Sequence, residues 1–213
     1  MKEKEVKASK WSLCFAAGIA SIVLYCTFTL ISISFFPTPV NPVNNFLSQL
    51  GNSQLNPHGA IFYNLAVILA GLAAILFYVG IYQWYSKKER NRLLAAALVV
   101  GFVNALSIIM TGVFSESVNY SLHVFWSFLI FISFVPVLIL VNSALLTYPG
   151  FNKLISYYGF VVAVIDASLL IMLLIAGFGP GIGPLMEWIA VFSYLIWVGL
   201  IAYSTTKVIS QKA

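Results

Sequence analysis

Long apolar stretches separated by short polar segments form the dominant pattern along this chain. Six stretches each hold the roughly 20 mostly apolar residues that a helix needs to cross a bilayer. They cover residues 11–35, 59–85, 93–115, 121–147, 154–177 and 184–205. The pattern therefore predicts an all-α fold, a polytopic transmembrane bundle of six helices that forms one domain over residues 11–205. A basic tail at 1–10 precedes this domain, and a second tail at 206–213 follows it.

The basic residues predict how the bundle is oriented. All 11 Lys and Arg lie in the first tail, between the second and third stretches, between the fourth and fifth, or after the sixth. Lys and Arg close to the ends of membrane helices stay on the cytoplasmic side. We therefore expect a multi-pass protein of the cell membrane with both termini cytoplasmic and with the loop at 36–58 on the outer face.

Composition supports the membrane interpretation and narrows the partners. Of 213 residues, 61% are hydrophobic and 8% are charged, against about 45–50% and about 25% in soluble domains. This excludes a soluble protein. The net charge of +5 follows from the topology and gives at most a weak attraction to anionic lipid. The expected partners are therefore membrane lipids and other membrane subunits, with no nucleic acid.

The loop at 36–58 is the longest connection, and it is rich in amides and hydroxyls without a formal charge. Its polar side chains are Asn41, Asn44, Asn45, Ser48, Gln49, Asn52, Ser53, Gln54 and Asn56. Four apolar residues among them, Phe46, Leu47, Leu50 and Leu55, predict a short helix that lies against the bundle. The loop has two interpretations: it binds a polar ligand, or it is a folded cap that closes the outer end.

Both histidines and two of the acids fall at the outer ends of the predicted helices. They are His58, Glu116, His123 and Glu187, and the first, third and fourth of them are separated by 65 and 64 residues. This spacing predicts that His58, His123 and Glu187 lie close together, and such ligands suit a divalent metal as cofactor. No H-x-x-x-H spacing supports a metal, however, and polar caps of helix ends explain the same residues. Haem bound between His58 and His123 is a further alternative.

Asp166 is the one acidic residue expected midway across the membrane. A carboxylate there costs several kcal/mol unless it is protonated, paired or hydrated, so it should face the bundle interior. Asn104 is expected at a similar depth, and Ser107 and Thr111 continue its helix face outward. These residues form either a polar track toward the outer cluster or, as a hydrogen-bonded Asp166–Asn104 pair, a contact that pins two helices together.

Small residues predict where two helices approach closely. Ala97, Gly101 and Ala105 recur every four residues in the third stretch, a pattern that lets helix backbones come together in a membrane.

With these residues in view, the chain resembles the membrane-protein family called domain of unknown function 998, over about residues 36 to 200. The residues that carry the resemblance are Leu47, Ser48, Leu50, Gly51, Phe62, Asn64, Gly71, Gly112, Phe114, Glu116, His123, Glu187 and Trp197. The family often has an acidic residue where Gln49 stands and a basic one where Trp188 stands. The resemblance implies a six-helix membrane fold, and the family has no established activity to transfer.

Three functions remain open at this point. The chain is a noncatalytic membrane protein, either an accessory subunit of a complex or a lipid-binding scaffold. Alternatively, it is a metal-assisted enzyme that acts on a lipid head group at the outer leaflet through His58, Glu116, His123 and Glu187. The third possibility is a proton-coupled transporter that uses Asp166. We expect the first of these, and the sequence identifies no catalytic residue.

Overall fold

The computed structural model describes residues 12–86, 92–176 and 181–210, and these fold into the six expected helices and one short additional turn of helix. The helices are α1 (Leu13–Ser34), α2 (Ala60–Ser86), α3 (Arg92–Val113), α4 (Tyr120–Leu146), α5 (Lys153–Ala176) and α6 (Ile182–Ser210). All six are long and apolar enough to cross a membrane. The predicted fold class is therefore confirmed, with helix boundaries close to the predicted ones.

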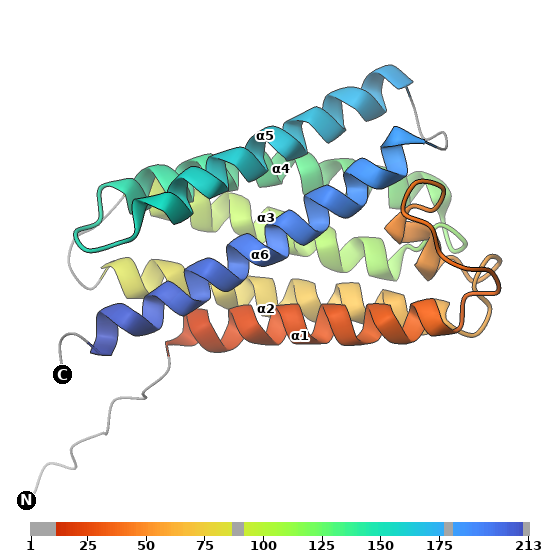
Figure 1. Ribbon diagram of the computed structural model, residues 1–213, viewed down its shortest axis with the longest axis horizontal. Helices are drawn as coiled ribbons and strands as arrows, with labels where there is room; N and C mark the ends of the chain where they lie inside the picture. Colours follow the sequence, from red (N-terminus) through yellow and green to blue (C-terminus); the bar gives the residue numbers. More distant parts are fainter. Residues whose placement is uncertain (1–11, 87–91, 177–180, 211–213) are drawn as a thin grey trace, which may run out of the picture.

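The six helices form a closed ring in chain order. Each helix packs against the next one along the chain, and α6 returns to pack against α1. Figure 1 shows them running side by side along the long axis, with the first residues of α1 and the last residues of α6 at the same end. We call this the tail end, and we call the opposite end, which carries residues 35–59, the loop end. Which end faces the cytoplasm stays a prediction, because most of the basic residues lie outside the described parts.

Local contacts fix where the first and last helices begin and end. The Ser12 hydroxyl accepts a hydrogen bond from the Phe15 amide at 3.0 Å, which caps α1. The same hydroxyl lies 2.7 Å from the Thr205 hydroxyl, so the start of α1 is tied to the last turns of α6. At the loop end, Gly181 adopts a φ of 112° immediately before α6, and its amide donates to the Val43 carbonyl at 3.1 Å.

Close helix contacts confirm the packing role of the small residues in α3. Ala97 and Ala105 are buried, and a Cβ added at Gly101 would come within 2.8 Å of the Tyr78 ring of α2. The approach of α1 to α2 is tighter, because a Cβ at Gly80 would meet the Cys14 backbone. Helices that approach this closely gain dispersion contacts that long side chains would prevent.

The tail-end half of the ring is filled by a dense aromatic core. Trp197 and Phe77 are completely buried, and their rings meet edge to face with centroids 6.0 Å apart. The Trp197 indole donates to Asn142 Oδ1 at 3.1 Å, which satisfies its polar group inside the bundle. This core fills the ring on the tail-end side of its midpoint. The interior space lies between the core and the loop end.

The short helix predicted in the loop is present as η1, a 3₁₀-helix at Leu47–Gly51. Leu47 and Leu50 are fully buried and Phe46 is nearly so, whereas Leu55 is exposed. The apolar side chains that η1 buries hold it against the ends of the helices. Asn56 strengthens this arrangement, because its amide donates to Ser32 and to the Leu50 carbonyl.

Candidate ligand cavity

Two adjoining cavities lie inside the loop half of the helix ring. The deep cavity has a volume of about 110 Å³ and is lined by side chains from all six helices, down to Asn104 and Asp166. The loop-end cavity has a volume of about 120 Å³ and lies among η1, Glu116 and helices α4, α5 and α6. Among the described residues, the lining of both comes mainly from the half of each helix nearer the loop end.

Five residues line both cavities and mark the place where the two meet. These residues are Ser48, His123, Ser127, Phe131 and Glu187. The two adjoining cavities therefore together reach from η1 to Asp166, which lies near the midpoint of its span. This is the course that the predicted polar track required, and Asn104 and Thr111 lie along it, while Ser107 is buried and donates to the Val103 carbonyl.

Glu187, in the second turn of α6, binds the start of η1. The Leu47 amide donates to its Oε2 at 2.6 Å, a short hydrogen bond that satisfies one of the amides left open at the start of η1. The neighbouring Trp188 indole donates to the Asn45 carbonyl at 2.8 Å. The first turns of α6 therefore bind Asn45, just before η1, and Leu47, the first residue of η1.

Glu116, just after α3, holds η1 from the other side. Its Oε1 accepts a hydrogen bond from the Ser48 hydroxyl at 2.9 Å, and its Oε2 accepts one from the Asn52 amide at 3.2 Å. Asn64 of α2 adds a third contact, from its amide to the Gly51 carbonyl at 3.1 Å. The short helix is thus fixed to α2, α3 and α6, and it forms a cap over the interior space.

One ring nitrogen of His123 is hydrogen-bonded to the backbone. Its Nδ1 lies 3.0 Å from the Phe114 carbonyl, and a carbonyl only accepts, so Nδ1 carries the hydrogen. The side chain is buried on the first turns of α4 and lines both cavities. In a neutral imidazole with this tautomer, Nε2 is an acceptor, which makes His123 able to receive a hydrogen bond from a ligand.

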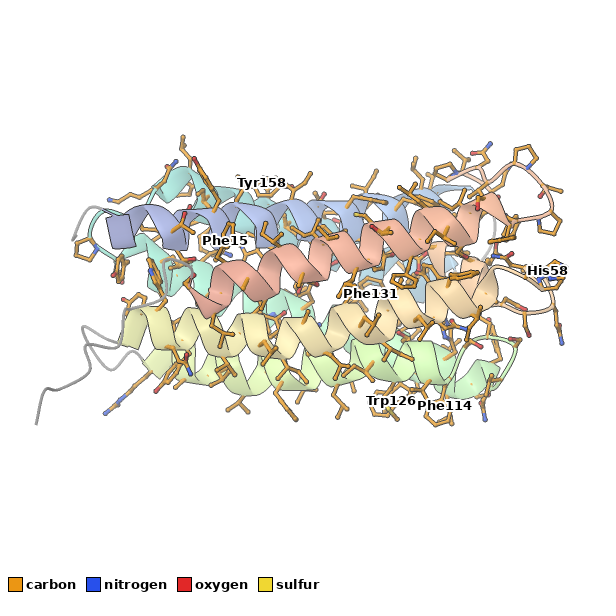
Figure 2. All side chains as sticks on the ribbon, turned by 90° about the horizontal axis from the view of Figure 1, so that it is seen from below. Phe15, His58, Phe114, Trp126, Phe131 and Tyr158 are labelled. Carbon is orange, nitrogen blue, oxygen red and sulfur yellow. The ribbon has the colours of Figure 1, made fainter. Side chains whose placement is uncertain are left out.

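His58 stands apart from this group. It is exposed in the loop before α2 begins, and it lines neither cavity. Figure 2 shows it at the loop end, beyond the ends of the helices. Of the four residues expected to gather at the outer ends, the structure brings Glu116, His123 and Glu187 to one cavity and leaves His58 outside it.

The described residues provide no set of ligands for the metal ion considered from the sequence. Within residues 12–86, 92–176 and 181–210, no group of three or more His, Cys, Asp or Glu side chains is placed to hold a metal ion. Glu116 and Glu187 both accept hydrogen bonds from the capping segment. A metal bound by His58, His123 and Glu187 therefore stays a hypothesis without geometric support.

Asp166 and Asn104 share the deep cavity, but their hydrogen bonds differ from the expected pair. Asn104 Nδ2 donates to the Ile130 carbonyl at 2.9 Å and to the Ser133 hydroxyl at 3.2 Å, and its Oδ1 accepts from the Tyr78 hydroxyl at 3.1 Å. Asp166 is 1% exposed, and its Oδ2 has no hydrogen-bond partner among the described residues. Asn104 thus joins α3 to α2 and α4, while Asp166 lines the cavity and carries a buried oxygen without a hydrogen-bond partner in the described residues.

Tyrosines inside the helix ring are the part of the site that the sequence did not reveal. Tyr25 and Tyr63 place their hydroxyls 3.4 Å apart on the cavity wall, and the hydroxyls of buried Tyr78 and half-buried Tyr194 are also 3.4 Å apart, at a deeper position. Tyr25, Tyr63 and Tyr194 line the deep cavity. For Tyr25, Tyr78 and Tyr194 the signal was present, since they lie inside apolar stretches rather than at their ends, where interfacial tyrosines are expected.

The combined lining sets the chemistry that this space offers. It is mostly apolar and aromatic, with three carboxyl groups, Asp166, Glu116 and Glu187, and with the imidazole of His123; no Lys or Arg of the described chain lines it. Such a cavity favours an apolar body and polar groups that donate hydrogen bonds.

The ring of six apolar helices defines a multi-pass membrane protein. The chain belongs to the family described as Protein of unknown function (DUF998), whose model matches residues 19–204. This confirms the resemblance drawn from the sequence and extends it to α1. No curated protein and no solved structure is detectably similar to the chain.

Proposed function

We propose that this protein binds a small amphipathic molecule inside its helix ring, the lipid-binding role among the functions considered above. The observation that carries the proposal is the pair of adjoining cavities inside the ring, of which the deeper is lined by all six helices, beneath the short helix η1. Ligand sites are typically concave and mostly apolar, with a few convergent polar groups. A subunit that only supports a complex needs no such space.

The size of the space favours a small ligand. Each cavity, at about 110 and 120 Å³, is somewhat smaller than an apolar cavity of about 150 Å³ that binds benzene. Ser127 and Phe131 line both cavities, so a shift of these side chains would let one molecule with a short chain occupy both. Removing its chain from water stabilises the complex by about 0.8 kcal/mol for each buried CH₂ group.

A one-sided space favours binding over passage through the membrane. The aromatic core around Phe77 and Trp197 fills the tail-end half of the ring, so a carrier would have to open a densely packed region. Asp166 is the observation that speaks for the proton-coupled transporter, because it lies on the cavity near the middle of its span. The closed tail end leaves that role second to binding.

The test is ligand-dependent thermal stability of the purified protein in detergent, with hexanol as the probe. A ligand present at about ten times its Kd stabilises the folded state by about 1.4 kcal/mol, which corresponds to a rise in Tm of about 3–6 °C for a chain of this size. The blocking variant is Ser127→Phe, since Ser127 lies where the two cavities meet. The matched control is Ser168→Phe, which adds the same bulk to an exposed position of α5.

The proposal expects the parent protein and Ser168→Phe to show the same rise in Tm, and Ser127→Phe to show little or none. An equal rise in all three proteins would place hexanol on the outer surface and overturn the proposal. So would a parent protein that responds neither to hexanol nor to charged molecules with the same hexyl chain.

A further inference from the structure

The interior space holds an acidic group that the fold itself leaves unused. Asp166 is 1% exposed, it lines the deep cavity, and its Oδ2 has no hydrogen-bond partner in the described parts of the chain. A buried polar group without a partner costs about 1–3 kcal/mol, and more when it is charged. The fold therefore provides no hydrogen bond to Asp166 Oδ2 in the described residues, which points to a partner from outside the chain.

The polar side chains near Asp166 already donate hydrogen bonds to other acceptors. The Tyr78 hydroxyl donates to Asn104 Oδ1, and the Asn104 amide donates to Ile130 and Ser133. Because the Tyr78 hydrogen is used in this way, the contact between the Tyr78 and Tyr194 hydroxyls at 3.4 Å takes its hydrogen from Tyr194. These neighbouring side chains therefore donate their hydrogens to one another or to the backbone, and not to Asp166.

The charge and the aromatic lining of the space select the sign of a ligand. Asp166, Glu116 and Glu187 line it without a Lys or Arg in the described sequence. Aromatic rings lie at the same depth, since Phe134 and Tyr194 line the deep cavity and pack edge to face with centroids 4.3 Å apart. Ring faces attract cations, and an anion would find no Lys or Arg in the described lining to pair with.

From these observations, and resting on the proposed function, we infer that the ligand carries a cationic amine that donates to Asp166. The ammonium group supplies a hydrogen-bond donor and the positive charge that would stabilise the Asp166 carboxylate, and its apolar chain follows the cavity toward Phe131. Glu116 and Glu187 do not provide the same partner, since both already accept hydrogen bonds from the capping segment.

The experiment compares three probes with one chain: hexylammonium, hexanol and hexanoate, each titrated into the purified protein by calorimetry at neutral pH. Hydrogen bonds to charged groups are worth more than neutral ones, so hexylammonium should bind at least about tenfold more tightly than hexanol, and hexanoate should bind most weakly. In Asp166→Asn, which keeps the shape of the side chain, the advantage of hexylammonium should disappear while the affinity for hexanol stays within about threefold.

A second variant locates the cation. Glu187→Gln keeps an acceptor for the Leu47 amide and removes a carboxyl group from the loop-end cavity, so it should retain most of the preference for hexylammonium. If Glu187→Gln abolishes that preference and Asp166→Asn does not, the amine binds under the cap and the assignment to Asp166 is overturned.

The outcomes separate this inference from the proposed function. Equal binding of hexylammonium and hexanol to the parent protein defeats the amine and leaves the cavity as a binding site. Absence of binding by all three probes defeats the proposed function itself. Because the comparison among probes is made first in the parent protein, the inference is tested even if Asp166→Asn fails to fold.

Discussion

Replacing Asp166 and Asn104 in turn by leucine separates a group that holds the fold together from one that does not. Asn104 makes three hydrogen bonds, to Tyr78, Ile130 and Ser133. Hydrogen bonds between membrane helices average about 0.6 kcal/mol each, so Asn104→Leu should lower the free energy of unfolding by about 2 kcal/mol. Asp166→Leu removes an unpaired buried oxygen and should leave that free energy unchanged or raise it by up to about 1 kcal/mol.

The assay is equilibrium unfolding by a denaturing detergent in mixed micelles, followed by circular dichroism. The two variants act as controls for each other, because both replace a buried polar side chain at a similar depth by the same apolar one. A loss of about 2 kcal/mol for Asp166→Leu would show that Asp166 has a structural partner, and it would refute the reasoning that leaves this carboxyl group to a ligand.

Three further predictions concern packing, the cap and topology. Gly80→Ala should destabilise the protein by about 1–3 kcal/mol in the same assay, because its Cβ would meet the Cys14 backbone; an unchanged stability would contradict the close contact. Glu187→Ala removes the acceptor of the Leu47 amide and should speed hydrogen exchange in η1 about tenfold, whereas unchanged exchange would show that the cap is held by other contacts. A cysteine at Asn52 should react with an impermeant reagent in intact cells and one at Lys88 should not; the reverse pattern would invert the topology.

The helices could be predicted because the bilayer imposes a simple rule on the chain. A segment without water must satisfy its own backbone hydrogen bonds and remain apolar for about 20 residues, and all six segments meet this rule. The short helix η1 was also predictable, since Leu47 and Leu50 need a buried surface. The small residues of α3 showed where a neighbour would approach, but not that this neighbour is α2.

The hydrogen-bond partners of the polar side chains could not be predicted from the sequence. Equal depth correctly suggested that Asp166 and Asn104 face the same interior, but depth leaves the rotation of each helix open, and Asn104 turns its amide to Ile130 and Ser133. His58 shares a spacing with His123 and Glu187, yet it falls in the loop before α2 begins and is exposed there. Spacing along the chain fixes neither the end of a helix nor the direction of a side chain.

The cap and the cavity emerge only from contacts between distant segments. Glu116 and Glu187 were expected at the outer ends, but their role depends on where η1 lies, because each accepts a hydrogen bond from it. Of the two interpretations of the loop, these contacts favour the cap. An interior space arises where side chains of six helices fail to fill the ring, and no local pattern in the sequence encodes that shortfall.

Anomalous diffraction from crystals grown with bromohexylamine tests the central claim most directly, because bromine is located independently of any model of the ligand. The account predicts one strong bromine peak inside the helix ring, in the space lined by Ser127 and Phe131, and its loss in Ser127→Phe. Peaks confined to the lipid-facing surface of the helices, with none inside the ring, would contradict a binding site in the interior.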